Sequence, residues 1–386
     1  MKGLKEAGFN VAELGMQTVG GIIKDEYGNK NLSVRYDAWA GDCLGDYLRS
    51  FKADCFISIF DLWLSQCNFI PGLMKELKIP WIAHITINSA PLSPYLAGKL
   101  LETTIIVAPS KFNYSVLQEA GFQKSVYIPH GYDPAKFYPS SEAEKQQMKE
   151  KLELEGKFIF LCVNRNKGVQ KNYLDLFYAY KIFLEANPKA KKDSVLLMLN
   201  DPQEPEGVNL FHARQRYGLQ ENIKWIKMKP SPDWEFLEPY PENNVTAFYH
   251  HANMHFKEDM MRKIYGIADV HIITSQGESF GLPIVESMAC GIPNIFCEHS
   301  TGPELIGESK GGLLAKVKTT LSTPLLSEIW LPDPQSIAEK MQLLYTDESL
   351  RKTCSENGMK FVKQNYTWDT IIPKWIKLIE SIEFLS

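Results

Sequence analysis

The stretch Ala268-Asp-Val-His-Ile-Ile-Thr-Ser-Gln-Gly-Glu-Ser-Phe-Gly-Leu-Pro-Ile-Val-Glu-Ser-Met-Ala-Cys-Gly-Ile-Pro293 carries the strongest structural signal in this chain of 386 residues. Its apolar run Val270–Thr274 predicts a buried strand. A polar turn at 275–281 leads into a helix that we expect to begin with Pro283, where a missing N–H costs nothing, and to end before Gly291. The free N–H groups and positive dipole end of such a helix predict an anion-binding site.

Two carboxylates lie in this stretch, Glu278 in the turn and Glu286 in the first part of the helix. An ionised carboxylate only accepts hydrogen bonds, and its two oxygens suit a vicinal diol. A ribose or a hexose held beside a diphosphate would use both acids, and Gly281 lets the backbone approach a ligand closely. The structural alternative is that the two acids only complement the helix dipole.

On both sides of this stretch, short apolar runs alternate with amphipathic segments, which predicts an α/β fold with parallel sheets. The expected strands are Cys55–Phe60, Trp81–Ile87, Thr104–Ala108, Ser125–Ile128, Phe158–Val163, Ser194–Leu199, Ile223–Ile226, Val270–Thr274 and Ile292–Phe296. The expected helices are Leu44–Phe51, Pro71–Leu77, Lys111–Ala120, Ser141–Leu154, Tyr173–Ala186, Glu258–Ile267, Pro283–Cys290, Pro334–Thr346 and Glu348–Asn365, with an inserted loop at Pro230–Tyr249. A glycine and three prolines between 129 and 139 place a domain boundary near residue 140, so we expect two doubly wound units.

Composition excludes several classes of protein. The net charge of −4 gives no basic field for nucleic acid. No apolar run approaches the length of a membrane-spanning helix, and residues 1–10 contain no apolar signal core. The seven scattered cysteines include no C-x-x-C pair, which favours reduced thiols in a cytoplasmic protein.

The segment Glu278-Ser-Phe-Gly-Leu-Pro-Ile-Val-Glu286 resembles the E-x7-E signature of retaining nucleotide-sugar glycosyltransferases of the GT-B fold, especially family 4. The resemblance extends through Tyr265–Val270, Ser300–Ile306, Gly311–Leu314 and Tyr366–Asp369. It implies two Rossmann-like domains that face each other across a cleft, at 1–139 and 140–365. A final helix within 366–386 would pack back on the first domain.

The resemblance also implies roles for individual residues. After the strand Phe158–Val163, Arg165 and Lys171 match the positions that hold the donor diphosphate, with Lys167 as a competing candidate. Glu286 would hold the ribose. The sugar would be bound by Glu278 and by the turn residues Ser279, Phe280, Gly281 and Leu282. The departing phosphate would itself take the acceptor proton, so the enzyme would position groups and stabilise charge.

The acceptor side is predicted less fully. Asn88, which follows a strand, is the better-placed candidate for acceptor or donor-sugar contact, whereas His84 lies inside an apolar run and is interpreted as a core residue. Residues 2–14 resemble the end of the family's first helix, its glycine cap and its second strand. The first strand and its glycine-rich loop are missing before them, so we expect an incomplete first domain. The segment 126–139 is expected to be the connection between the domains.

The function that the sequence favours is transfer of a hexose from a UDP- or GDP-sugar to a hydroxyl of a glycan, lipid or protein, without a cofactor or metal. A histidine group, His250, His251 and His255, lacks an accompanying metal motif, and Leu62–Leu77 lacks the basic face of a membrane-surface helix, so membrane contact is at most peripheral. The alternatives are a sugar-nucleotide epimerase, a glycogen-synthase-like polymerase and a non-catalytic sugar-nucleotide-binding subunit. A dinucleotide oxidoreductase would need a G-x-G-x-x-G motif, which the chain lacks. The sugar, the base, the acceptor and the oligomeric state stay open.

Overall fold

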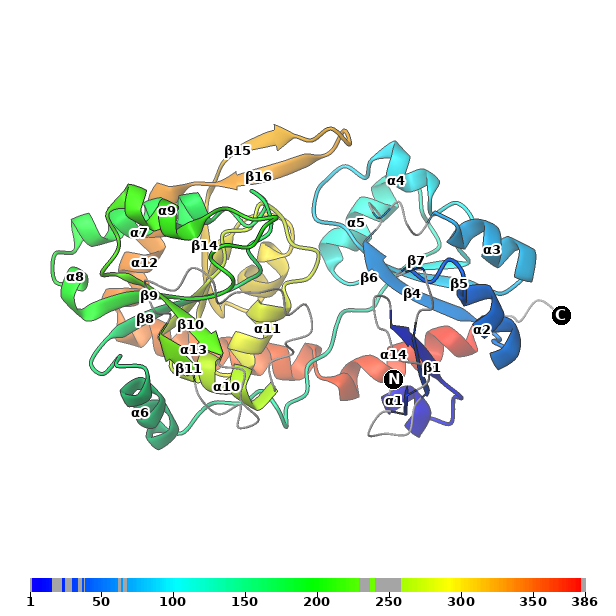
Figure 1. Ribbon diagram of the computed structural model, residues 1–386, viewed down its shortest axis with the longest axis horizontal. Coiled ribbons are helices and arrows are strands. Elements are labelled where there is room, and N and C mark those ends of the chain that lie inside the picture. Colours follow the sequence, from blue (N-terminus) through cyan, green and yellow to red (C-terminus); the bar gives the residue numbers. More distant parts are fainter. Residues whose placement is uncertain are drawn as a thin grey trace. The chain divides into compact units, whose positions relative to one another are not determined.

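The computed structural model describes residues 2–15, 23–24, 30–33, 37, 39–61, 64, 68–228, 237–239 and 258–382. The chain divides into two compact units (Figure 1). Unit 1 comprises residues 1–131, 322–328 and 368–386, and unit 2 comprises 132–321 and 329–367. The three histidines at 250, 251 and 255 lie outside the described residues, and so does the predicted inserted loop at 230–249 except for 237–239, which form a strand.

Unit 1 is built around a four-stranded parallel sheet in the order β4-β5-β6-β7. Its strands are β4 (Phe56–Asp61), β5 (Trp81–Thr86), β6 (Ile105–Ala108) and β7 (Ser125–Tyr127), and its helices are α2 (Leu44–Phe51), α3 (Ile70–Leu77), α4 (Pro94–Gly98) and α5 (Lys111–Glu119). Helix α5 begins where the Ser110 hydroxyl accepts the Asn113 N–H, a normal N-cap. Ile70 and Met74 of α3 are buried in the unit 1 core. This part of Leu62–Leu77, for which a membrane-surface helix was the alternative, is therefore a core helix.

The beginning of the chain forms the elements that residues 2–14 predict. Helix α1 (Lys2–Glu6) is followed by Gly8 in the left-handed region at φ 94° and by strand β1 (Ala12–Gly15). Strand β1 pairs in parallel with β3 (Lys30–Ser33), which also pairs with β2 (Ile23–Lys24), in a separate three-stranded sheet.

Helix α14 (Trp368–Glu380) packs within unit 1. Its Ile371, Leu378 and Ile379 lie in one buried cluster with Ile82 of β5 and Val107 of β6. The cluster covers the sheet face opposite to the one that carries the α2, α3 and α5 side chains, because successive residues of a strand point to opposite faces.

Unit 2 contains a seven-stranded sheet in the order β11-β10-β9-β8-β12-β13-β14. The strands are β8 (Phe158–Val163), β9 (Ser194–Leu199), β10 (Ile223–Met228), β11 (Leu237–Pro239), β12 (Val270–Ile272), β13 (Asn294–Cys297) and β14 (Gly312–Ala315). All neighbours pair in parallel except β10 and β11. From β8 the chain winds first toward β10 and later toward β14, so strand order reverses between β8 and β12. Ligands in open α/β sheets bind outside the strand ends at such a reversal.

Both faces of this sheet are covered. Residues Phe160 and Cys162 of β8 face the cluster that includes α7 (Tyr173–Ala186), α9 (Leu210–Tyr217) and α12 (Pro334–Thr346). Leu161 and Val163 face the cluster that includes α6 (Glu142–Lys151), α10 (Glu258–Gly266), α11 (Leu282–Ala289) and α13 (Glu348–Asn365). This two-sided burial explains why the strands read as continuous apolar runs.

The predicted α/β architecture with parallel sheets in two Rossmann-like units is confirmed. Six predicted elements have the observed bounds, among them β8 and α7. The predicted strand Val270–Thr274 is shorter, since β12 ends at Ile272, and α11 begins one residue before Pro283. The sequence analysis missed α4, α8 (Ala190–Asp193), α9, β14 and the π-helix η2 (Pro303–Glu308). It also missed β11, which lies within the predicted inserted loop, and the antiparallel hairpin β15 (Val317–Ser322) and β16 (Glu328–Pro332).

We predict that acid destabilises unit 1 through two histidines, the buried His84 and the partly buried His130. The rings of His84 and His130 lie 4.7 Å apart, and burial lowers the pKa of His84 to about 3 and that of His130 to about 4, from an ordinary value of 6.5. Between pH 6.5 and these lowered pKa values the unfolded chain binds protons that the folded unit does not. Stability therefore falls as pH falls, by on the order of 2 kcal/mol per histidine at pH 5. Thermal unfolding recorded from pH 7.5 to 5 checks this.

The variant His84→Leu supplies the control, because it removes one titrating group from an apolar site where the His84 Nδ1 has no hydrogen-bond partner among the described residues. Its melting temperature should fall less steeply with acid than that of the wild type. Equal slopes for the two proteins would contradict the assignment.

Candidate active site at the strand reversal of unit 2

The loops that follow β8 and β12 meet at the carboxyl edge of the unit 2 sheet. They comprise residues 164–172 and 273–281, which come together because β8 and β12 are neighbouring parallel strands. The Asn164 side-chain amide donates to the Ser275 hydroxyl over 2.9 Å, and the Gln276 N–H donates to the Gln170 carbonyl over 2.8 Å. The Thr274 hydroxyl also donates to the Asn172 carbonyl. The two loops therefore form one hydrogen-bonded platform.

An ion pair joins the same two loops. The Lys171 Nζ lies 2.7 Å from the Glu278 Oε1, and the two side chains are only 15% and 16% exposed. Partial burial weakens solvent screening, and the short distance is typical of a charge-assisted hydrogen bond. The structure thus brings together the cation that the sequence assigns to diphosphate and the acid that it assigns to the sugar.

Arg165 lies on the β8 loop and pairs with the loop that follows β9. Its guanidinium is 2.9 Å from Glu204 and 3.5 Å from Glu206, and its side chain is 58% exposed. An exposed guanidinium keeps its charge and can exchange one carboxylate for a phosphate. The sequence analysis did not anticipate these two acidic partners, because loop-to-loop pairing leaves no local pattern.

Helix α11 begins at the platform. Gly281 is its N-cap residue, with φ of 96°, a conformation that L side chains rarely adopt. Leu282 follows as the first helical residue with 41% exposure, and Pro283 is second. The first N–H groups of a helix have no partner within it, so this end of α11 offers backbone donors toward the platform.

The side chain of Phe280 is 4% exposed and packs edge-on against Tyr366, with ring centroids 5.5 Å apart. It therefore belongs to the core of unit 2, and any ligand contact from this residue would come from its backbone. Ser279 is partly exposed beside it in the turn.

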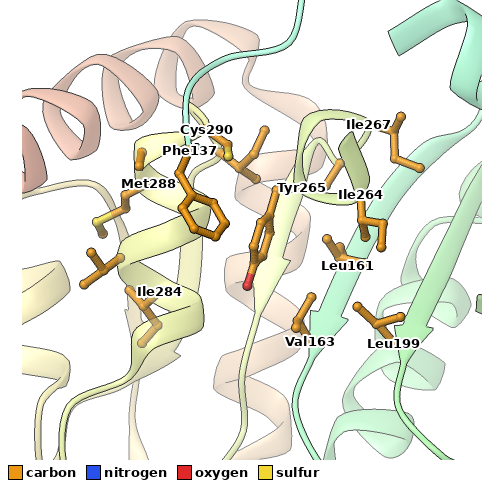
Figure 2. Close-up of a cluster of buried hydrophobic side chains, with 14 of the residues drawn as sticks. Phe137, Leu161, Val163, Leu199, Ile264, Tyr265, Ile267, Ile284, Met288 and Cys290 are labelled. Atoms are coloured by element: carbon orange, nitrogen blue, oxygen red, sulfur yellow. The ribbon is translucent and has the colours of Figure 1, made fainter. Parts of the chain in front are cut away.

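Glu286 lies on α11, where its Oε2 accepts a 2.9 Å hydrogen bond from the Tyr265 hydroxyl. Figure 2 shows the Tyr265 ring in the buried cluster near Phe137, Leu161 and Val163. Burial, with the Glu286 charge as a further cause, raises the pKa of Tyr265, which keeps its hydroxyl as a proton donor. Tyr265 orients the Glu286 carboxylate. The sequence analysis had placed Tyr265 only in the segment that leads into β12 and had given it no role in the site.

Asn88 and His84 lie in unit 1. Asn88 is half-buried and follows β5, whereas His84 is 2% exposed within β5 and contacts the rings of His130 and Trp375. The buried position of His84 agrees with its interpretation as a core residue.

Among the residues that the structure describes, no group of three or more His, Cys, Asp and Glu side chains is arranged to hold a metal ion. None of the described helices is both long and apolar enough to cross a bilayer.

We predict that Gly281→Ala destabilises unit 2 and disturbs the start of α11. A Cβ at this position would meet Ile284 and Leu305 carbons at 3.2 Å, in addition to the cost of a positive φ. We expect a loss of about 1–3 kcal/mol in the free energy of unfolding. The control is Gly218→Ala, at φ 69° with nothing within 4 Å of the added Cβ. It should lower the melting temperature less, and an equal shift in scanning calorimetry would contradict the steric part of the argument.

Comparison with known proteins agrees with this geometry. Residues 243–323 match the family model described as glycosyl transferases group 1. The chain is 23% identical over 255 residues to mannosylfructose-phosphate synthase of Agrobacterium fabrum, an alignment that covers 66% of this chain and 47% of that protein. It thus spans about half or less of the length of the curated relatives it matches.

Solved structures cover more of the chain. Sucrose-phosphate synthase from Thermosynechococcus elongatus superposes with a TM-score of 0.72 at 16% identity, over 98% of this chain and 90% of that one. HepE of Anabaena, solved in complex with UDP and glucose, superposes with a TM-score of 0.67 at 15% identity, over 92% and 88%. Residues 243–323 therefore match a glycosyl transferases group 1 domain, and the chain has the fold of the GT-B glycosyltransferases.

Proposed function

We propose that this protein is a retaining glycosyltransferase that moves a hexose from a UDP- or GDP-sugar to a hydroxyl of a glycan, lipid or protein acceptor. The observation that carries the proposal is the convergence of two cations and two carboxylates at the strand reversal of unit 2. Lys171, Arg165 and Glu278 lie on the strand-end loops, and Glu286 lies on the helix that begins beside them.

In this proposal the nucleotide is held from two sides. Glu286, oriented by Tyr265, accepts hydrogen bonds from the ribose hydroxyls. Arg165 and Lys171 bind the diphosphate and neutralise the charge that develops when the bond to the sugar breaks. The Lys171 ammonium has three donors, so it can contact a phosphate while one N–H stays on Glu278.

The hexose would lie against Glu278 and the turn at 279–282. Glu278 Oε1 faces Lys171, and the second carboxylate oxygen is an acceptor for a sugar hydroxyl. The backbone N–H groups at the start of α11 can donate to the sugar or to the phosphate. Asn88 of unit 1 is proposed as a contact on the acceptor side.

The reaction would be a front-face displacement. The acceptor oxygen forms a bond to the anomeric carbon as the bond from that carbon to the diphosphate breaks. The acceptor proton moves to the departing phosphate oxygen, and the configuration at the anomeric carbon is kept. Positioning and charge stabilisation are then the protein's contributions. Because Arg165 and Lys171 stabilise the leaving group, we propose that turnover persists in the presence of EDTA.

The names and ligands of similar proteins support a nucleotide-sugar donor. HepE was solved with UDP and glucose, and another structural neighbour, a trehalose-6-phosphate protein from Escherichia coli, was solved with UDP-2-fluoro glucose. The direct test is incubation with UDP- and GDP-hexoses and a panel of acceptors. Release of the nucleoside diphosphate is measured, and NMR reads the product's anomeric configuration. An inverted product would contradict the retaining mechanism, and isomerised donor without transfer would favour an epimerase.

We predict that Glu286→Ala lowers turnover of the donor by at least about 100-fold, because the ribose loses its acceptor and Tyr265 loses its partner. The matched control is Glu339→Ala, which removes an exposed carboxylate on α12. That control should keep wild-type rates. Unchanged turnover in Glu286→Ala, measured with the donor and acceptor pair found active, would overturn this assignment.

A further inference from the structure

The backbone of Glu278 is held by a residue with an unusual conformation. The Ser300 Oγ accepts the Glu278 N–H over 3.1 Å. Ser300 has φ of 45°, in the left-handed region that a residue with a Cβ enters at a cost. Sparsely populated conformations persist where the surroundings impose them, and they concentrate at functional sites. The strain at Ser300 aims its hydroxyl at the loop that carries the acid of the proposed sugar site.

His299 holds the Ser300 hydroxyl in turn. The His299 Nδ1 lies 3.0 Å from the Ser300 Oγ. The imidazole is 4% exposed and lies parallel to the indole of Trp330, with centroids 5.2 Å apart and planes 8° apart. Phe296 contacts the same ring edge-on. Burial lowers the pKa of His299 to about 4, so the ring is neutral near pH 7.

The Trp330 backbone extends this contact to the β12 loop. Its N–H donates to the Gln276 carbonyl over 3.0 Å, so Trp330 meets both the histidine and the loop two residues before Glu278. A line of contacts therefore runs from Trp330 through His299 and Ser300 to the main chain of Glu278.

Several polar atoms of these residues and of the neighbouring Thr301 are buried, which is costly. The His299 Nε2, the Gln276 Oε1 and the Thr301 Oγ1 are buried without a hydrogen-bond partner among the described protein atoms. An unsatisfied buried polar atom costs roughly 1–3 kcal/mol, and apolar side chains of similar shape would avoid that cost. A polar ring at position 299 therefore calls for a reason other than packing, and its contacts with the Ser300 hydroxyl and with the Ser275 backbone supply two.

We propose that His299 and Ser300 are positioning residues that fix the main chain of Glu278, so that its carboxylate faces the donor hexose. This inference rests on the proposed function. Lys171 fixes the carboxylate end of Glu278, and Ser300 fixes the backbone end, so that the side chain is restrained at both ends. The nucleotide is held elsewhere, by Glu286, Arg165 and the free donors of Lys171. Loss of Ser300 or His299 should therefore affect sugar binding and turnover, while nucleotide binding is unchanged.

Ser300→Gly separates positioning from structural support. Glycine removes the hydroxyl and with it the hydrogen bonds to Glu278 and His299, but it adopts φ of 45° without strain. Because the relief of strain offsets the lost hydrogen bonds, the melting temperature should change little. We expect kcat to fall at least about tenfold, while the Kd for free UDP or GDP changes less than about twofold. Calorimetry should also show that the intact nucleotide sugar loses its affinity advantage over the free nucleotide. The matched control is Lys310→Gly, at an exposed site of unit 2 with φ of 52°, which should keep the wild-type kcat.

A second pair of variants tests His299. His299→Phe keeps a ring against Trp330 but removes the polar atom near Ser300, and it should lower kcat as Ser300→Gly does. His299→Asn can place a polar atom near the Nδ1 position and should recover part of the loss. A merely structural role would instead make the variants with lower kcat also the less stable ones.

The outcomes distinguish the two proposals. If Glu278→Gln lowers kcat but Ser300→Gly and His299→Phe do not, the positioning role is wrong and the proposed function stands. If Glu278→Gln and Glu286→Ala both keep wild-type turnover and wild-type affinity for the nucleotide sugar, the proposed function itself fails. A parallel loss of kcat in Ser300→Gly and His299→Phe, with free-nucleotide affinity and stability retained, supports the positioning role.

Discussion

The ion pair between Lys171 and Glu278 is the interaction on which the candidate site depends. It connects two loops that leave neighbouring parallel strands, and it lies where strand order in the unit 2 sheet reverses. The backbone hydrogen bond between Gln276 and Gln170 runs beside it. Because both side chains of the pair are mostly buried, each restricts the other's position more than an exposed pair would. Arg165 lies on the same loop as Lys171, and α11, which carries Glu286, begins directly after the loop of Glu278.

The site is placed by the same burial that builds the fold. Strand β8 is covered on both faces, so its side chains are committed to two cores and its polar neighbours are confined to the strand end. Helix α11 buries Ile284, Val285 and Met288 in one of these cores, which fixes the direction of its first turn. Tyr265 couples core and site most directly, since its ring is fully buried while its hydroxyl reaches Glu286.

Helices and strands were predictable where their burial leaves a clear pattern of apolar residues in the sequence. The run Phe158–Val163 and the segment Tyr173–Ala186 have the predicted bounds, because a two-sided strand and a long apolar helix leave clear patterns. The hairpin β15–β16 was missed, since β15 is mostly exposed and lacks a strong alternation of apolar and polar residues. Helix α9 was missed because its N-cap, Asn209, precedes a segment that is weakly amphipathic.

The sequence alone determined the α/β class, the strand-turn-helix unit around 270–290, and the identity of the candidate acids and cations. The class and the strand-turn-helix unit follow from apolar periodicity and from glycine and proline positions, which act over a few residues. The roles of the candidate acids and cations follow from the resemblance to family 4 glycosyltransferases. Only the tertiary structure decided the partners. Lys171 meets Glu278 across 107 residues, Arg165 meets Glu204 across 39, and Ser300 reaches the Glu278 backbone across 22. Such pairs form where strand order brings loop ends together, and no local pattern records which loops become neighbours.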